Sequence, residues 1–294
     1  HIENQELLGE KLALLSGMDK VFFCNSGAEA NEAAIKLARL YGHNKGIELP
    51  TIIVMEKSFH GRTMATLTAT GNRKAQAGFE PLLTGFVRVP YDDLVAVEQI
   101  AANNKNIVAV LVETYQGEGG VNIPQATYLD GLRRLCDQNN WLLMLDEVQC
   151  GIGRTGKWFA FQHSNSSPDI ITLAKGLGSG VPIGACIAKG AAADIFKPGN
   201  HASTFGGNPL ACKAALTTLK VIEQDQLMQN AISMGNLMRD RFKEKLASWS
   251  NVIKIRGQGL MLGIELPIPC GELVKEALAT KLLINVTSER VVRL

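Results

Sequence analysis

The chain has 294 residues, a formal net charge of +2, 46% hydrophobic residues and 20% charged residues. These values are typical of a water-soluble globular protein with one or two domains. Because both signs of charge are interspersed and no apolar run is long enough to span a bilayer, the composition argues against a nucleic-acid partner and a membrane partner.

The first two thirds of the chain alternate between apolar runs and helical patterns. After a short helical pattern near the N-terminus come runs typical of strands that are buried on both faces. These runs cover residues 21–23, 51–55, 107–112, 142–145 and 170–173. Helical patterns lie between them at 28–41 and 128–138. The alternation predicts an α/β domain built on a mostly parallel sheet.

After Asn208 the pattern changes to one typical of a smaller α+β unit. Helical patterns cover 209–222, 227–246 and 272–281, and strand patterns cover 252–255, 259–266 and 283–286. We therefore expect a large domain over residues 1–226 and a smaller, incomplete C-terminal domain over residues 227–294. The chain opens at His1 and stops inside a further strand pattern at 291–294, so we interpret it as a piece of a longer protein.

Polar side chains follow four of the predicted strands. Ser26, Glu113, Asp146 and Lys175 come after the first, third, fourth and fifth strands. Ligands of open α/β sheets bind outside the carboxyl ends of the strands. We therefore expect these four side chains to share one site.

Lys175 and Asp146 are the most informative of the four. Lys175 ends an apolar run and is followed by glycines, which predicts a buried amine placed to form a Schiff base with a carbonyl. The alternative is a lysine that reaches solvent along its own aliphatic chain. A buried carboxylate at Asp146 needs a cation or a protonated ring nitrogen as partner. The alternative is a solvated acid in a surface loop.

Residues 24–29 join the first strand to a helix. Ser26 and Glu29 have the spacing of a capping box, which by itself explains both residues. A glycine-containing turn into a helix N-terminus also offers free amides and the positive end of the helix dipole, so Gly27 and its neighbours are a candidate phosphate site.

Three further segments carry candidate binding residues. Phe59 is placed to stack on a ring and Arg62 to bind a carboxylate, although a core phenylalanine and a surface arginine would fit the same pattern. His60 is interpreted as structural. Glu118 lies in a glycine-rich turn whose alternative reading is a surface loop. Residues 203 and 204 are hydroxyl residues beside glycines, which suits a phosphate.

Six segments, in this order along the chain, resemble the class III (subgroup II) aminotransferases. They are residues 25–32, 59–62, 116–120, 145–149, 174–176 and 204–209. Each segment alone is a weak signal, and the ordered set is specific for the family. The resemblance covers essentially the whole chain. It implies the type I pyridoxal phosphate-dependent transferase fold and a homodimer with shared active sites.

The resemblance also implies a role for each residue that contacts the cofactor, pyridoxal 5'-phosphate. Lys175 carries the covalent link, Asp146 pairs with the pyridine nitrogen, and both are the implied catalytic residues. The other implied contacts are Gln149 at the ring hydroxyl, Phe59 and Val148 on the ring faces, Ser26, Gly27 and Ala28 at the phosphate, and the partner subunit's Thr204.

The implied reaction moves the terminal amine of N2-acetylornithine to 2-oxoglutarate, in cytoplasmic arginine biosynthesis. Ornithine, succinylornithine and succinyldiaminopimelate stay open as amino donors. The implied substrate-binding residues are Arg62 and Glu118 of the same subunit, together with Ser203 of the partner subunit. Glu118 neutralises a second arginine while the donor is bound, and we expect that arginine outside this chain. Thr114 and Tyr115 stand where the family usually has a proline and an apolar residue, so we expect Tyr115 to alter the pocket.

Two other classes of protein compete with this interpretation. A non-catalytic dimerisation module on the same fold is disfavoured because every implied cofactor position is present. A Rossmann dehydrogenase is disfavoured because no G-x-G-x-x-G follows the first strand. The six cysteines form no C-x-x-C pair and the five histidines are scattered, so we expect reduced, mostly buried thiols and no metal site.

Overall fold

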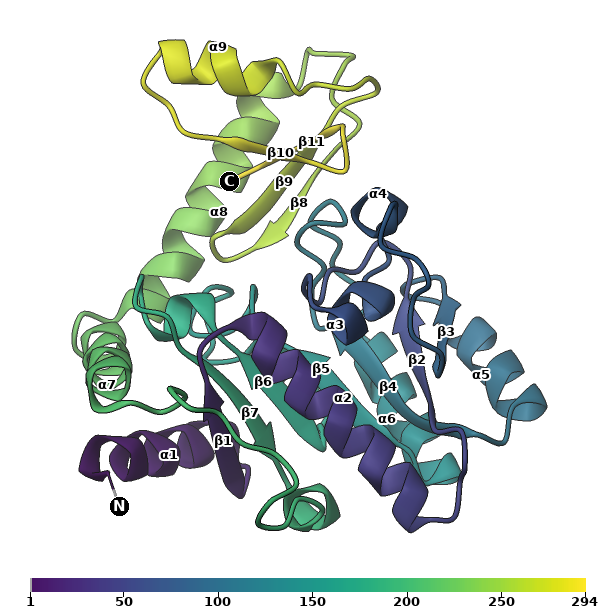
Figure 1. Cartoon of the computed structure of the whole chain (residues 1–294). Coiled ribbons are helices and arrows are strands. Elements are labelled where there is room, and N and C mark those ends of the chain that lie inside the picture. Colours follow the sequence, from purple (N-terminus) through teal and green to yellow (C-terminus); the bar gives the residue numbers. More distant parts are fainter. Residues whose placement is uncertain (1) are drawn as a thin grey trace.

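The computed structural model describes residues 2–294, and its larger part is built on a seven-stranded sheet (Figure 1). The strand order is β1-β7-β6-β5-β4-β2-β3. Only β7 runs against the others, since it pairs antiparallel with both β6 and β1. The strands are β1 Lys20–Cys24, β2 Thr51–Met55, β3 Phe86–Val89, β4 Ile107–Glu113, β5 Leu142–Asp146, β6 Ile170–Leu173 and β7 Gly184–Ala188.

Helices cover both faces of this sheet, which explains why its strands read as unbroken apolar runs. Ile52 and Val54 of β2 pack in the cluster with α2, whereas Ile53 and Met55 pack in the cluster with α1, α5, α6 and α7. The helices are α1 Glu3–Ser16, α2 Gly27–Asn44, α3 Met64–Ala69, α4 Arg73–Gln76, α5 Leu94–Asn103, α6 Tyr128–Asn139 and α7 Pro209–Gln224. Single 3-10 turns occur at η1 Ala160–His163, η2 Lys175–Leu177 and η3 Gly190–Asp194.

A second, four-stranded antiparallel sheet with the order β10-β11-β9-β8 forms the C-terminal part. Its elements are α8 Leu227–Leu246, β8 Lys254–Gln258, β9 Met261–Glu265, α9 Leu273–Ala279, β10 Asn285–Thr287 and β11 Val291–Arg293. Figure 1 shows α8 rising from α7 to this sheet, and the small core holds Ile264, Cys270 and Val292. Gln226, with φ of +51°, separates α7 from α8, so we propose a domain boundary between residues 226 and 227.

The sequence predicted the α/β class and the two-part organisation correctly. All five predicted strands of the large sheet are present, and the helix predicted at 227–246 has those bounds. The strands β3 and β7 were not predicted from the sequence. The 259–266 pattern is a turn followed by β9, since Gly259 has φ of +56° and reverses the chain after β8. All six cysteines are free and buried. No helix of the part described is long and apolar enough to cross a membrane.

Candidate functional site

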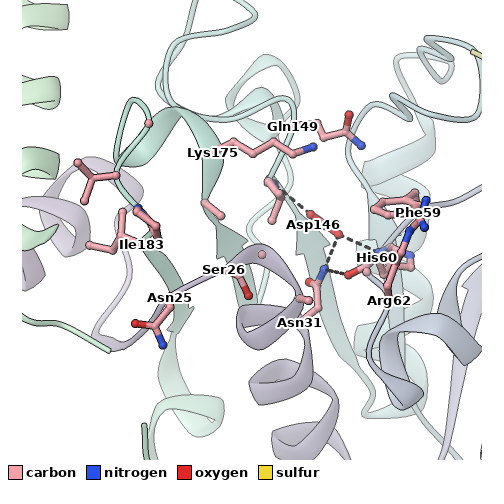
Figure 2. Close-up of a pocket in the computed structure, with 18 residues that line it drawn as sticks. Asn25, Ser26, Asn31, Phe59, His60, Arg62, Asp146, Gln149, Lys175 and Ile183 are labelled. Atoms are coloured by element: carbon pink, nitrogen blue, oxygen red, sulfur yellow. Dashed lines mark hydrogen bonds and ion pairs between the residues drawn. The ribbon is translucent and has the colours of Figure 1, made fainter. Parts of the chain in front are cut away.

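A cavity of about 690 Å³ lies at the carboxyl edge of the large sheet (Figure 2). Its walls come from the segments after β1, β2, β5 and β6 and from the turn before β7. The candidate site residues that line it are Ser26, Gly27, Ala28, Phe59, Arg62, Asp146, Val148, Gln149 and Lys175. The structure therefore brings the predicted strand-end residues together, with Glu113 just behind the wall.

Lys175 differs from the prediction of a buried amine at a strand end. The strand β6 ends at Leu173, and Lys175 opens a 3-10 turn with φ of +42°, where its side chain is exposed to the cavity. Its amine points toward Gln149 (Figure 2). Partial burial lowers the pKa of this amine, and Asp146 and Glu118 oppose that shift. Positive φ is uncommon for a residue other than glycine, so the backbone at Lys175 is held by its surroundings.

Asp146 is the last residue of β5 and is only 3% exposed. Its Oδ2 atom accepts hydrogen bonds from Asn31 Nδ2 and from His60 Nδ1, both at 2.8 Å. Its Oδ1 atom accepts the amide of Val148 at 3.0 Å. Thr172 in turn donates to Asn31 Oδ1 at 2.7 Å, so a buried network fixes the direction of the carboxylate.

The turn into α2 contains one half of the predicted capping box, since Ser26 is the N-cap and accepts the Glu29 amide, but the Glu29 side chain accepts the amide of Asn25 and not that of Ser26. The Glu29 amide donates to Ser26 Oγ at 3.2 Å, and Glu29 Oε2 accepts the Asn25 amide at 2.5 Å. Gly27 is packed so closely that a Cβ atom there would lie 2.8 Å from Val148 Cγ1. The turn therefore presents backbone to the cavity at the positive end of an 18-residue helix.

Glu113 lies behind the cavity wall and is 2% exposed. It accepts the Phe59 amide at 3.0 Å, and it lies 3.3 Å from both the Gly117 amide and Gln149 Nε2. Burial, with the nearby charge of Asp146, raises the pKa of this carboxyl to about 8. Glu113 thus ties together the loops that carry Phe59 and Gln149.

These residues fit pyridoxal phosphate by the chemistry of their groups. A helix N-terminus with a closely packed glycine suits the phosphate, and the oriented carboxylate of Asp146 suits a protonated ring nitrogen. Phe59 and Val148 offer apolar surface for the ring, and Lys175 offers an amine of lowered pKa. His60 Nδ1 is the donor to Asp146 because a carboxylate oxygen only accepts, and the buried His60 Nε2 has no hydrogen-bond partner among residues 2–294.

The expectation that the arginine paired with Glu118 lies outside this chain is wrong, since Glu118 pairs with Arg293. Its Nη1 atom lies 2.7 Å from Glu118 Oε1 and 3.1 Å from Gln149 Oε1. The prediction failed because Arg293 lies on β11, and no pattern in the sequence pairs that strand with a residue 175 positions earlier. The available signal was Arg293 itself, a single charged residue in the otherwise apolar run 291–294.

The predicted residues 203 and 204 lie outside the cavity wall. Ser203 Oγ accepts the Gly206 amide at 3.0 Å and Asn25 Nδ2 at 3.3 Å, and Thr204 is exposed. Because Asn25 lines the cavity, this loop sits at its border. A contribution of these residues to a neighbouring subunit's site stays a prediction.

Thr114 and Tyr115 point away from the cavity, contrary to the expectation for Tyr115. The Thr114 hydroxyl donates to buried Glu147 at 2.8 Å. Tyr115 is 6% exposed, and its hydroxyl donates to Gln258 Oε1 of β8 at 3.1 Å. Both residues therefore hold the loop after β4 in place and do not line the cavity.

Among residues 2–294, no group of three or more His, Cys, Asp or Glu side chains could hold a metal ion.

The family model described as aminotransferase class-III matches residues 1–294. The acetylornithine aminotransferase of Nitrosomonas europaea is 76% identical over 294 residues, which is all of this chain and 75% of that protein. The acetylornithine aminotransferase of Methanocaldococcus jannaschii is 47% identical over 287 residues, covering 97% of this chain and 72% of that protein.

Solved structures agree with the sequence relatives. The ornithine aminotransferase of Toxoplasma gondii ME49 has a TM-score of 0.95 at 35% identity, over all of this chain and 71% of that chain. The acetylornithine aminotransferase of Elizabethkingia anophelis has a TM-score of 0.88 at 38% identity, over all of this chain and 74% of that chain. A second structure of the Toxoplasma enzyme describes partial occupancy of PLP at its active site.

Proposed function

The chain belongs to the class III aminotransferases, a pyridoxal phosphate-dependent family, and on that premise we propose its reaction and substrates. It transfers the terminal amine of N2-acetylornithine to 2-oxoglutarate, giving N-acetylglutamate 5-semialdehyde and glutamate in arginine biosynthesis. The observation that carries the proposal is one cavity that holds Lys175, Asp146 and Arg62, with the Glu118–Arg293 pair beside it.

The residues that would hold the cofactor are those of the cavity wall. Ser26, Gly27 and Ala28 would bind its phosphate, Phe59 and Val148 would cover the ring faces, and Gln149 would bond its hydroxyl. When bound, pyridoxal phosphate supplies a carbonyl that exchanges with amines and a ring that withdraws electrons from the carbon next to the amine.

Asp146 keeps its charge directed at one point of the cavity. Asn31, His60 and the Val148 amide hold both carboxylate oxygens, so the side chain cannot turn away. A fixed carboxylate stabilises a proton on a ring nitrogen opposite it, and it does so without reorganisation during the reaction.

Lys175 supplies the amine for attachment and then serves as the general base. Its Nζ atom would take the proton from the substrate carbon that bears the terminal amine. Burial in the cavity wall lowers the pKa of Nζ, which raises its neutral fraction near neutral pH and suits it to accept that proton.

Arg62, Glu118 and Arg293 would sort the substrates by their carboxylates. Arg62 would bind the single carboxylate of the donor while Glu118 keeps Arg293 neutralised, at 2.7 Å. 2-Oxoglutarate has two carboxylates, so its second one would compete with Glu118 for Arg293. One cavity could then accept both substrates in alternation.

We also propose that the active form is a homodimer in the cytoplasm, with Ser203 and Thr204 reaching the other subunit's cavity. In support, the same loop and the helix after it expose two large apolar side chains, Phe205 at 72% and Leu210 at 74%. Such apolar exposure is typical of a surface that a partner covers.

A donor panel tests the proposed reaction. Purified protein with pyridoxal phosphate and 2-oxoglutarate is offered N2-acetylornithine, ornithine, N-succinylornithine and N-succinyl-diaminopimelate, and glutamate formation is measured. We expect the highest kcat/KM for N2-acetylornithine. Ornithine is the second candidate, favoured by the TM-score of 0.95 to an ornithine aminotransferase, and a higher kcat/KM for ornithine would replace the first. Protein that binds cofactor but uses no donor would overturn both.

A further inference from the structure

The loop that carries Glu118 is a small closed unit. Gln116 and Asn122 form an isolated antiparallel bridge, with both amide-to-carbonyl distances at 3.0 Å. We call residues 116–122 the Glu118 loop. Thr287 of β10 donates its hydroxyl to the Glu118 carbonyl, and Arg293 of β11 pairs with the Glu118 carboxylate. The small sheet therefore contacts the tip of this loop.

Arg256 of β8 makes the most extensive of these contacts. Its Nε atom donates to the carbonyls of Gly120 at 3.1 Å and Val121 at 2.9 Å, and its Nη2 atom donates to Gly120 at 2.6 Å. Its Nη1 atom pairs with Glu265 at 2.5 Å. The Arg256 side chain is 14% exposed, so these bonds form where little water competes.

The two carbonyls that Arg256 holds belong to residues in uncommon backbone conformations. Gly120 has φ of +114° and Val121 has φ of +52°. Positive φ is strained for a β-branched residue and persists only where surrounding contacts impose it. Val121 is fully buried, and a Cβ atom on Gly263 of β9 would lie 3.0 Å from its Cβ. Arg256 and this packing together impose the shape of the loop.

The same guanidinium bonds to β9, the strand next to the one that carries Arg293. Its partner Glu265 ends β9 and is in register with Val291 of β11, two residues before Arg293. Arg256 thus bonds at once to the Glu118 loop and to the sheet that positions Arg293. It does not line the main cavity, so it acts on substrates only through other residues.

We propose that Arg256 is a positioning residue that sets the Glu118–Arg293 pair and thereby the balance between one-carboxylate and two-carboxylate substrates. The inference rests on the proposed function. Without the Arg256 bonds the Glu118 loop relaxes from its strained shape, the Glu118 carboxylate spends less time on Arg293, and Arg293 is freer to bind the second carboxylate of glutamate or 2-oxoglutarate.

Half-reaction kinetics of the holoenzyme test this proposal. The change in visible absorbance is followed after mixing with N2-acetylornithine or with glutamate, and the ratio of the two kcat/KM values is compared between variants. For Arg256→Met we expect a shift of about 3- to 30-fold toward glutamate, the range for residues that modulate coupling between sites. Arg256→Lys, which keeps the charge and one donor group, should restore part of the ratio.

Arg290→Met is the matched control, because Arg290 lies 4.0 Å from the same Glu265 and has no bond to the Glu118 loop among the described contacts. It should leave the ratio unchanged. A ratio that Arg256→Met leaves unchanged, or two half-reactions slowed equally, would overturn the proposal. If Arg256→Met does not fold, Arg256→Lys provides the test. A lysine cannot make the same set of bonds to the two carbonyls, so the ratio of the two kcat/KM values must still change.

A double-mutant cycle with Glu118→Gln separates this inference from the proposed function. If Arg256 acts through Glu118, Arg256→Met adds no further shift in the Glu118→Gln background. A further shift there overturns the inference and leaves the proposed function standing. A Glu118→Gln variant whose ratio equals that of the unchanged protein overturns the proposed role of Glu118 and this inference with it.

Discussion

The cofactor edge of the large sheet and the Glu118–Arg293 contact are built in different ways. At the edge, Asp146 ends β5 and Lys175 follows the neighbouring strand β6, and hydrogen bonds from helix α2 and β6 fix the direction of Asp146. The Glu118–Arg293 contact joins a loop of the large sheet to the last strand of the small one. The geometry of the cofactor edge depends on the large sheet and α2 alone. The geometry of the Glu118–Arg293 contact depends on how the large and the small sheet pack against each other. Reaction chemistry and substrate choice can therefore be disturbed separately.

The strongest test of the edge is Lys175→Ala. Losing both the attachment amine and the general base should lower kcat for every donor by about 10⁴-fold or more. The variant should also lack the visible absorbance that borohydride reduction fixes in the unchanged protein. Lys189→Ala, on an exposed lysine bonded to Ser167, is the control and should keep both properties. Full transamination by Lys175→Ala would remove Lys175 from the chemistry.

Glu113 tests whether the edge carries a buried proton. Its folded pKa, about 8, lies above the unfolded value, so the folded state keeps a proton that the unfolded state loses. The contribution of Glu113 to the free energy of unfolding is therefore largest below about pH 4.5 and declines as the pH rises toward 8. Between these pH values the free energy of unfolding should fall by about 3–5 kcal/mol because of this group. Glu113→Gln should abolish this pH dependence.

Chemical unfolding of cofactor-free protein at several pH values measures this effect. The unchanged protein should lose stability from pH 5 to pH 8 relative to Glu113→Gln. Glu276→Gln, on the small unit's helix α9, is the control and should follow the unchanged protein. Parallel pH profiles for Glu113→Gln and the unchanged protein would show that Glu113 is ionised in the folded state.

Arg293 tests the contact between the units. Arg293→Met should raise KM for 2-oxoglutarate by about 10- to 100-fold, the value of one lost charged hydrogen-bond pair, with little change in KM for N2-acetylornithine. Glu118→Gln should lower KM for glutamate, because Arg293 is then free to bind the second carboxylate of glutamate. Equal changes for both substrates would mean that the pair supports the structure of the cavity and does not sort carboxylates.

The sequence predicted the edge well and the contact poorly, for a physical reason. Buried parallel strands have a recognisable apolar pattern, and their carboxyl ends must lie at one edge, so Ser26, Asp146 and Lys175 could be placed together. The turn conformation of Lys175 was missed because an apolar run followed by glycines does not show at which residue the strand ends. Arg293 and Arg256 were missed because no recognisable sequence pattern shows how two separate sheets pack against each other.

The smallest expected effect concerns Tyr115, which fastens the loop after β4 to β8. Tyr115→Phe removes one hydrogen bond to Gln258, which costs about 0.5–1.5 kcal/mol and lowers Tm by about 1–5 °C. Tyr41→Phe is the matched control: its hydroxyl bonds the Asn140 carbonyl at 2.9 Å within the large unit. Because Tyr115 does not line the cavity, the order of donors in the panel should stay the same in both variants. A changed donor order in Tyr115→Phe alone would show that the hydrogen bond between the loop after β4 and β8 also affects substrate choice. The Glu118–Arg293 contact would then not be its only determinant.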